Sequence, residues 1–339
     1  MASSPLELTR TQILAFRRRV GGLEERLPRG ARSLRQAAWA GLQDSMPRAA
    51  LLSIHARVEG AHAASWEDRA LVQVWGPRFS VFVVPARDHA IFTLARLPDD
   101  ERGRRRAEDL AALLHGFLRG RRLTDREVAR GIGVGNRMRY ATATGTLLIR
   151  WEGARAPLVW TVPRPEIEPL EARRELARRY LHVYGPTTSA AFAKWAGIGT
   201  AEGRAAFDTL GRSLVAVRTP IGDAWILARD EAAIREPAGA SAAARLLPSG
   251  DAYWLLQGAD RELLVPDAAQ RAELWTQRVW PGAVLVGGEI VGTWRRAQEK
   301  LAVDPWRRLT PAERSAVEAE ARSLPLPGLE QEIVVAWNA

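Results

Sequence analysis

The chain has 339 residues, of which 47% are hydrophobic and 26% are charged, so it is long and apolar enough for two or three folded domains. It contains no cysteine, which excludes disulfides, thiolate zinc sites, iron–sulfur clusters and cysteine nucleophiles. The 49 Lys and Arg residues outnumber the 39 acidic residues, and the formal net charge of +10 favours an anionic partner such as nucleic acid. Most of this charge is arginine, which a GC-rich genome also produces, so charge supports that partner only together with a suitable fold.

The start of the chain, Met1 to Glu7, lacks a basic segment followed by an apolar run, and we expect no signal peptide. No stretch approaches 18 uncharged apolar residues, the length that a membrane span requires. We therefore expect a soluble, cytoplasmic protein.

The first predicted unit, residues 1–98, consists of helices followed by a β-hairpin. Thr9-Arg10-Thr11-Gln12 has the form of a capping box and predicts the start of a helix. Two more helices are predicted over 34–40 and 48–58. The β-prone runs 71–75 and 79–84 flank Gly76-Pro77-Arg78 and predict the hairpin.

The second predicted unit, residues 105–165, follows a polar segment, 97–106, that we interpret as a linker. Apolar residues recur at helical spacing from 110 to 118, and Thr124-Asp125-Arg126-Glu127 is another capping box. A Gly-rich turn and a short helix carrying Arg137 and Arg139 come next. Strands over 147–151 and 157–162 complete the order of a winged helix, a unit that typically holds a helix against DNA.

The remaining sequence predicts a third such unit over 168–238 and a β-rich C-terminal subdomain with a terminal helix over 244–339. The third unit has three helical segments, strands at 214–219 and 224–228, and a Gly/Ala/Ser/Pro-rich link at 237–243. In the last part, Gly287-Gly288 joins two strands, and Thr310-Pro311-Ala312-Glu313 predicts a helix start. The expected fold class is α+β, with three tandem winged-helix units.

Polar Gln43, Asp44 and Ser45 lie between two apolar helices, in a segment bounded by Gly41 and Pro47. Such a segment allows a loop to approach a ligand. Successive side chains in an extended segment face opposite ways, so Gln43 and Ser45 share one side. A structural alternative is that Gln43 and Asp44 only cap the helix that starts near Pro47.

In this context the chain resembles the AlkZ/YcaQ-like family of winged-helix DNA glycosylases and DNA-binding proteins. The resemblance covers nearly the whole chain and includes the glutamine segment, residues 173–195, Arg245-Leu246-Leu247-Pro248 with Asp251 and Tyr253, and residues 291–295. It implies three tandem winged helices and a β-rich part around a DNA-sized channel. It also implies that a Gln-x-Gln loop hydrolyses the N-glycosidic bond of alkylated purines. The first Gln corresponds to Gln43, and the second position is Ser45 here.

The chemistry of this reaction suggests roles for the three polar residues. A cationic alkylated purine leaves readily, so the protein has to position a water at C1′ and stabilise an oxocarbenium-like centre. We expect Gln43 to hold the water, with Ser45 as a shorter companion. Asp44 would favour the developing positive charge if it points inward. Candidate DNA-binding residues near the loop, on the second recognition helix and on its wing are Arg48, Arg57, Arg137, Arg139 and Arg155.

The preferred interpretation is a monomeric protein that binds double-stranded DNA and acts as a monofunctional DNA glycosylase, with no membrane association. The five histidines are scattered without ligand spacing, so we expect no metal and no cofactor. The alternative is a non-catalytic winged-helix DNA-binding protein, either a regulator or a lesion sensor. A third hypothesis, a protein-interaction module, predicts no salt-dependent affinity for DNA.

Overall fold

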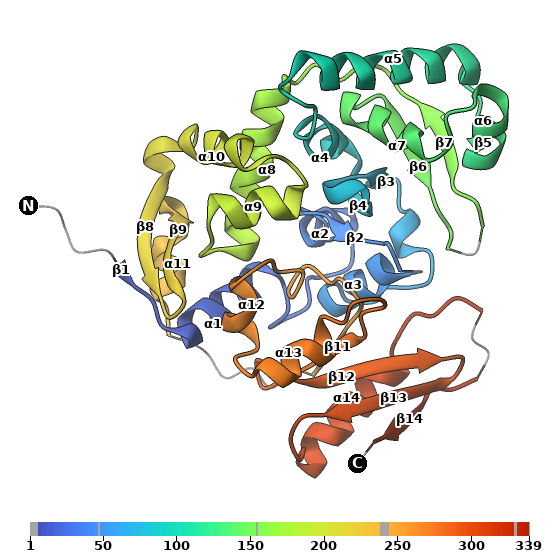
Figure 1. Ribbon diagram of the computed structural model, residues 1–339. Helices are drawn as coiled ribbons and strands as arrows, with labels where there is room; N and C mark the ends of the chain where they lie inside the picture. Colours follow the sequence, from blue (N-terminus) through green and yellow to red (C-terminus); the bar gives the residue numbers. More distant parts are fainter. Residues whose placement is uncertain (1–5, 47, 154, 238–243, 329–330, 339) are drawn as a thin grey trace, which may run out of the picture.

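The computed structural model describes residues 6–46, 48–153, 155–237, 244–328 and 331–338. Most of the predicted link at 237–243, Ala154 of the predicted second turn, and Pro47 lie outside the described residues. Within the described ranges the strands form three separate sheets, and helices surround them, which is a mixed α+β architecture (Figure 1). Among these residues, no helix has both the length and the apolar character that crossing a membrane requires.

The first part of the chain forms the predicted helices and hairpin. The capping box at Thr9 is present, because the Thr9 hydroxyl accepts from the backbone N–H of Gln12 and the Gln12 side chain accepts from that of Thr9. The elements are α1 (Arg10–Val20), α2 (Ala31–Ala37), β2 (Leu42–Gln43), α3 (Ala49–Arg57), β3 (Leu71–Trp75), β4 (Val81–Pro85) and α4 (His89–Leu94).

The second part contains the elements predicted for it, but it begins earlier than expected. Helix α5 (Glu101–Leu118) occupies much of the segment that we interpreted as a linker, and the Asp100 carboxylate caps it by accepting from the Gly103 N–H. The prediction of a linker over 97–106 is therefore wrong from Asp100 onward. The other elements are β5 (Leu123–Thr124), α6 (Asp125–Ile132), α7 (Met138–Ala141), β6 (Leu147–Arg150) and β7 (Leu158–Thr161).

The first and second hairpins belong to one sheet of six strands, in the order β2-β4-β3-β6-β7-β5. Strands β3 and β6 are antiparallel, with Gln73 opposite Ile149. This junction connects segments more than 70 residues apart, and it places β2, which carries Gln43, at one edge of the shared sheet.

The third part lies at the left of Figure 1 and packs helices against a smaller sheet. Strand β1 (Leu6–Glu7), at the N-terminal end, adds to this sheet in parallel with β8. The elements are α8 (Pro169–Tyr184), α9 (Ser189–Ala196), α10 (Thr200–Asp208), β8 (Leu214–Thr219), β9 (Gly222–Leu227) and α11 (Glu231–Arg235).

The C-terminal part contains a five-stranded sheet in the order β10-β11-β12-β13-β14, at the bottom of Figure 1. The predicted hairpin at Gly287-Gly288 joins β11 to β12, and the predicted last helix is α14. Its elements are β10 (Arg245–Leu247), α12 (Asp260–Leu264), α13 (Ala268–Leu274), β11 (Gly282–Val286), β12 (Glu289–Ala297), β13 (Lys300–Pro305), α14 (Pro311–Arg322) and β14 (Val334–Trp337).

The largest hydrophobic cluster unites the first, third and C-terminal parts. It includes Leu51 of α3, Trp195 of α9 and Trp254, and all three side chains are fully buried. Burying large aromatic side chains of this kind contributes several kcal/mol, on the order of 2 to 3 kcal/mol each. The segment around Gln43 therefore rests on a rigid core.

Candidate functional site

The glutamine loop, residues 41–46, leaves α2 and enters the six-stranded sheet as its edge strand. Leu42 and Gln43 pair with Val83 and Phe82 of β4, and the Asp44 N–H donates to the Val81 carbonyl at 2.8 Å. Gly41 has a φ of +82°, a conformation that side chains with a Cβ rarely adopt. The extended backbone gives Gln43 and Ser45 the same general direction and turns Asp44 to the opposite side.

Asp44 points into the protein and is bound there by two donors. Its Oδ1 accepts from the Ala50 N–H at 3.0 Å, and its Oδ2 accepts from Gln73 Nε2 at 2.7 Å. Burial raises the pKa of Asp44 to about 7, although these hydrogen bonds act in the opposite direction. The Asp44 carboxylate therefore caps the first turn of α3, as the structural alternative proposed for it.

Gln73 connects this carboxylate to the hairpin of the second part. Its Oε1 accepts from the Trp151 N–H at 2.6 Å, and its Nε2 also approaches the Trp151 carbonyl at 3.3 Å. Sequence analysis missed this residue, although a glutamine within the apolar strand Leu71-Val72-Gln73-Val74-Trp75 is an unusual choice for a buried position.

Gln43 is oriented by a second residue that sequence analysis missed, Arg78. The Gln43 Oε1 accepts from Arg78 Nη2 at 3.0 Å, and Arg78 Nη1 donates to the Trp195 carbonyl at 2.8 Å. On the other side, a Cβ placed on Gly250 would lie 3.1 Å from Gln43 Nε2, so the backbone there packs closely against the amide. Arg78 therefore fixes the carbonyl end of the Gln43 amide, and the Gly250 backbone lies close to its nitrogen end.

Arg78 and Phe79 lie in the connection between β3 and β4, and both have left-handed backbone conformations, with φ of 53° and 56°. Such a conformation costs about 1 to 2 kcal/mol for each residue that is not glycine. Strain of this size persists only where surrounding contacts over-determine the geometry. The contacts of Arg78 with Gln43 and Trp195 are of this kind.

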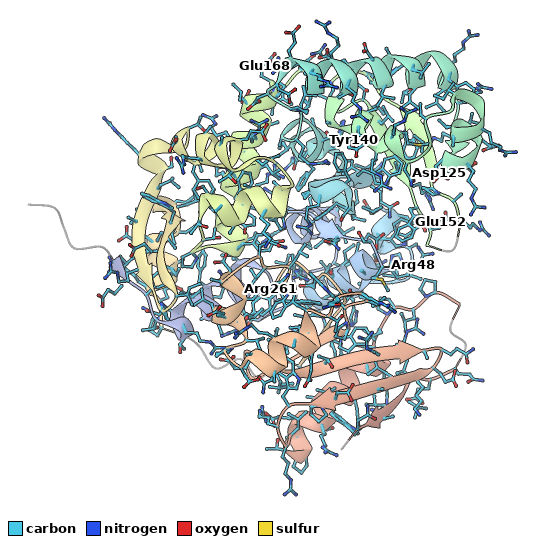
Figure 2. All side chains as sticks on the ribbon, in the orientation of Figure 1. Arg48, Asp125, Tyr140, Glu152, Glu168 and Arg261 are labelled. Carbon is cyan, nitrogen blue, oxygen red and sulfur yellow. The ribbon has the colours of Figure 1, made fainter. Side chains whose placement is uncertain are left out.

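Ser45 and Arg78 line a cavity of about 640 Å³, which we call the Ser45 cavity. Its walls come from the β3–β4 connection, α6, the turn before α7, α7 and the connection between β6 and β7. Figure 2 marks this region by Asp125, Tyr140 and Glu152, with Arg48 at the start of α3 below them. The charged residues that line the cavity are Arg78, Asp125, Arg126 and Arg139.

Two neighbouring arginines, Arg78 on the wall of this cavity and the buried Arg96 behind Phe79, carry positive charge. Burial lowers the pKa of Arg96 to about 9, and the charge of the neighbouring Arg78 acts in the same direction. The Arg96 guanidinium lies over the Phe79 ring, 3.8 Å from its centroid. In the described part of the chain, neither arginine forms an ion pair with a carboxylate. This environment favours an anionic group such as a phosphate.

Among the arginines predicted from sequence, three lie where a ligand could reach them. Arg139 lines the Ser45 cavity, and Arg48 lies at the start of α3 with its guanidinium 5.0 Å from the Trp66 ring centroid. The side chain of Arg155, in the connection between β6 and β7, is 84% exposed. Arg139 shares a cavity with Ser45 of the loop, whereas Arg155 does not line that cavity.

Arg137 and Arg57 are placed differently. Arg137 is exposed but lines a separate cavity with residues of α5, so it does not share the Ser45 cavity with Arg139. Arg57 is buried, and its two terminal nitrogens donate to the two carboxylate oxygens of Asp251, each at 2.7 Å. The prediction that Arg57 contacts a phosphate is wrong, because this guanidinium is neutralised inside the protein.

Among the described residues, no group of three or more His, Asp or Glu side chains is arranged to hold a metal ion. The loop and its contacts supply an amide, a hydroxyl and a nearby guanidinium. These groups hold water and anions by hydrogen bonds.

Comparison with known proteins relates this arrangement to one family. A curated relative, the interstrand DNA cross-link repair glycosylase of Streptomyces sahachiroi, is 28% identical over 241 residues, which are 63% of this chain and 63% of the relative's own length. The solved structure of Streptomyces sahachiroi DNA glycosylase AlkZ has a TM-score of 0.80 at 21% identity, with 98% of this chain and 100% of that chain covered. This second likeness establishes a shared fold.

The family described as DNA glycosylase AlkZ-like matches residues 37–325. The matched region starts in α2, includes the glutamine loop, Gln73 and Arg78, and reaches past α14. On this evidence the chain belongs to the AlkZ-like DNA glycosylase family.

Proposed function

We propose that the protein is a monofunctional DNA glycosylase that hydrolyses the N-glycosidic bond of alkylated purines in double-stranded DNA. The observation that carries this proposal is the fixed geometry of the glutamine loop in a member of the AlkZ-like family. Arg78 orients Gln43 at one side of the loop, and Ser45 lines a cationic cavity of about 640 Å³. Cavities of roughly this size are typical of ligand sites.

In the proposed reaction, a water oxygen bonds to C1′ of the damaged nucleotide while the bond from C1′ to the base breaks. The bonding electron pair goes to the cationic alkylated base, which leaves neutral, and the proton of the attacking water passes to solvent. Gln43 and the Ser45 hydroxyl hold the water, since a carbonyl oxygen keeps a second lone pair when one already accepts from Arg78.

We assign Asp44 a positioning role. Its two oxygens accept hydrogen bonds from Ala50 and Gln73 inside the protein, on the side of the loop opposite to Gln43 and Ser45. From behind the loop, it fixes the backbone that carries Gln43 and Ser45.

The DNA-binding architecture that we propose consists of three tandem winged helices. The units span residues 1–98, 105–165 and 168–238, with the second extended back to the start of α5, and residues 244–339 form the C-terminal subdomain. The order of helices followed by the β3–β4, β6–β7 and β8–β9 hairpins supports this division. In this arrangement Arg48, Arg139 and Arg155 contact backbone phosphates of the duplex, whereas Arg137 lies at the separate cavity beside α5. The acting form is a monomer without a cofactor.

The test measures base release from duplex DNA that carries an N7-alkylated guanine, detected as strand breakage after alkali. Because the curated relative is a cross-link repair glycosylase, a duplex with an interstrand cross-link through purine nitrogens serves as a second substrate. We expect release by the native protein and loss of at least about a hundredfold in Gln43→Ala, with duplex affinity retained.

Gln277→Ala is the matched control, because Gln277 is an exposed glutamine outside both the loop and the Ser45 cavity. The control should release base at the native rate. Salt-dependent duplex binding with no release from either substrate would contradict catalysis and favour a non-catalytic DNA-binding protein. Absence of duplex binding would contradict the DNA-binding proposal itself.

A further inference from the structure

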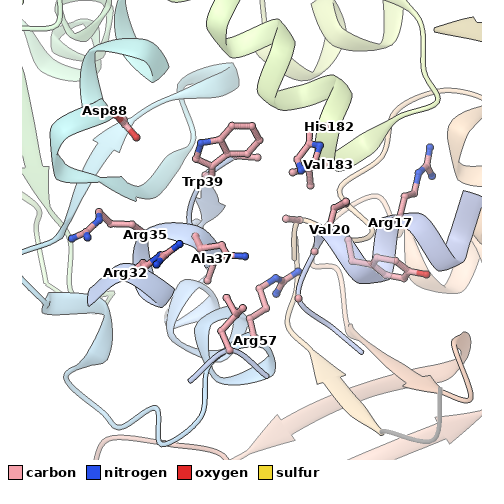
Figure 3. A pocket seen from close by; sticks show the side chains of 18 of the residues that line it. Arg17, Val20, Arg32, Arg35, Ala37, Trp39, Arg57, Asp88, His182 and Val183 are labelled. Carbon is pink, nitrogen blue, oxygen red and sulfur yellow. The ribbon is translucent and has the colours of Figure 1, made fainter. Parts of the chain in front are cut away.

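A second cavity, of about 520 Å³, lies at the opposite end of the glutamine loop (Figure 3). Gly41 lines it at the start of the loop, whereas Ser45 lines the cavity described above, and the two cavities share no lining residue. Its walls come from α1, α2, α3, the end of α8 and the short helical turns 86–88 and 228–230. We call it the arginine cavity, after Arg17, Arg32, Arg35, Arg57, Arg87 and Arg229.

Positive charge predominates among the residues that line the arginine cavity. Six arginines line the cavity, and Asp88 is the one acidic residue among the described lining residues. The Asp88 carboxylate is already engaged, with Oδ2 3.0 Å from Arg179 Nη1 and Oδ1 3.7 Å from Arg87 Nε. Asp251 neutralises Arg57, so this guanidinium adds little net charge. The excess positive charge therefore comes from the other arginines.

Arg32 and Arg35 carry the strongest part of this excess. They are three residues apart on α2, so their side chains lie on one face of the helix. Within the described residues, neither side chain has a carboxylate within ion-pairing distance or a hydrogen-bond acceptor. In Figure 3 both lie below Trp39 and His182, together with Arg57. Two guanidiniums without partners are thus available to a ligand.

The opposite wall is aromatic and rigid. The Trp39 indole meets His182 edge-on, with ring centroids 5.2 Å apart. Three guanidiniums, those of Arg178, Arg179 and Arg229, lie 5.0, 5.1 and 5.8 Å from the Trp39 ring centroid. The His182 Nδ1 is held by Asp230 at 2.9 Å, so this ring is also fixed. Because these side chains are already ordered, binding a ligand costs little of their conformational entropy.

We infer that the arginine cavity is a binding site for a phosphate-bearing ligand, separate from the Ser45 cavity. Guanidiniums bind phosphate through paired, charge-assisted hydrogen bonds, and the volume suits a group of nucleotide size. The phosphate comes either from a free nucleotide or from the DNA backbone. This inference does not depend on base release at the glutamine loop.

The test titrates the full-length protein with inorganic pyrophosphate and with adenosine diphosphate by calorimetry, and with duplex DNA by fluorescence anisotropy. The principal variant is Arg32→Gln/Arg35→Gln. Its control is Arg204→Gln/Arg212→Gln, which removes the same charge from exposed positions outside this cavity. Gln36→Glu is a second variant, because it adds a carboxylate beside both arginines on an exposed lining position without changing side-chain size.

We expect the affinity for at least one of the three probes to fall by more than about tenfold in both cavity variants and to stay within about twofold of native in the control. A loss for pyrophosphate or the nucleotide identifies a free ligand as the source of the phosphate, and a loss for the duplex alone identifies the DNA backbone. The inference is overturned if no probe distinguishes the cavity variants from the control. Base release is measured alongside with saturating duplex, where it depends on the reaction step and not on duplex affinity, so a native rate separates this result from the outcome at Gln43.

Discussion

Asp44 is a buried carboxylate directly behind the residues proposed to hold water. Burial raises its pKa from an ordinary 3.8 to about 7. The folded protein therefore binds a proton at Asp44 more tightly than the unfolded chain does. The stability associated with this group is complete below pH about 4 and is lost as the pH rises to about 7.

Asp44→Asn should remove this dependence, because asparagine does not titrate. The difference in free energy of unfolding between the native protein and the variant should change by roughly 3 to 4 kcal/mol from pH about 4 to about 8, with the native protein losing stability. Urea unfolding of both proteins across this pH range measures the difference in free energy of unfolding. His55, whose pKa burial lowers to about 4, has the opposite dependence, but it is present in both proteins and cancels. Parallel curves would contradict the buried, protonated state of Asp44.

Arg78 acts by orienting Gln43, and this effect can be distinguished experimentally from the effect of its positive charge. Lysine keeps the charge, but a single ammonium does not reproduce the fork that joins the Gln43 amide to the Trp195 carbonyl. If the proposed reaction holds, Arg78→Lys should lower kcat for base release by about tenfold to a hundredfold with little change in KM.

Arg126→Lys is the control for Arg78→Lys, because Arg126 lines the same cavity and has no hydrogen bond to Gln43. It should leave kcat close to native. Equal effects of the two substitutions on kcat would show that Arg78 does not act by orienting Gln43.

At the scale of elements, the connection from α2 to β2 depends on a glycine. Gly41 has a φ of +82°, and a Cβ there would lie 2.9 Å from Phe92 Cε1 and 3.0 Å from Phe82 Cδ1. Both phenylalanines are fully buried, so neither ring has room to move. Gly41 thus allows the glutamine loop to leave the helix close to the core.

Gly41→Ala should destabilise the protein by about 3 to 4 kcal/mol, the sum of backbone strain and overpacking. Gly120→Ala is a matched control, since Gly120 has a similar φ of +78° but nothing within 4 Å of the added Cβ. The control should cost only about 1 to 2 kcal/mol. Urea unfolding distinguishes the two, and equal losses would mean that the packing around Gly41 yields easily.

The shared six-stranded sheet is the element that connects the two ends of the candidate site. Strand β3 supplies Gln73, which binds Asp44 in the loop and the backbone of Trp151 at the end of β6. A displacement of the β6–β7 hairpin is therefore transmitted to the loop through one side chain. The pairing of β3 with β6 makes this route possible.

In the whole molecule, Arg137 and Arg139 lie on different surfaces although they are close in sequence. Arg139 lines the Ser45 cavity, and Arg137 lines a cavity beside α5. If duplex DNA occupies the side of the Ser45 cavity, Arg139→Gln should weaken binding and reduce the slope of log affinity against log salt by about one.

Arg137→Gln should have a smaller effect on the duplex affinity and on its salt slope, although it removes the same charge. Anisotropy titrations at several salt concentrations measure the two slopes. An equal or larger effect of Arg137→Gln would place the duplex on the α5 side of the molecule.

The local elements can be predicted from short stretches of the sequence. Capping boxes at Thr9, Thr124 and Thr310 begin helices in the structure as predicted, because each signal is complete within four residues. The hairpins also follow from short turns between apolar runs. Gln43 and Ser45 were found because they are polar residues in an apolar setting, with Gln43 at the first position of the family's Gln-x-Gln motif and Ser45 in place of its second Gln.

Which of these residues contact one another depends on how distant segments pack. Arg57 looked like a phosphate ligand in the sequence, but it is paired with Asp251, 194 positions away. The partners of the glutamine loop, Gln73 and Arg78, reach it through sheet pairing and through a connection whose backbone is left-handed. Capping and turn signals depend only on neighbouring residues. Burial and charge pairing depend on which distant segments pack together, and the hydrophobic periodicity of a sequence carries no information about that packing.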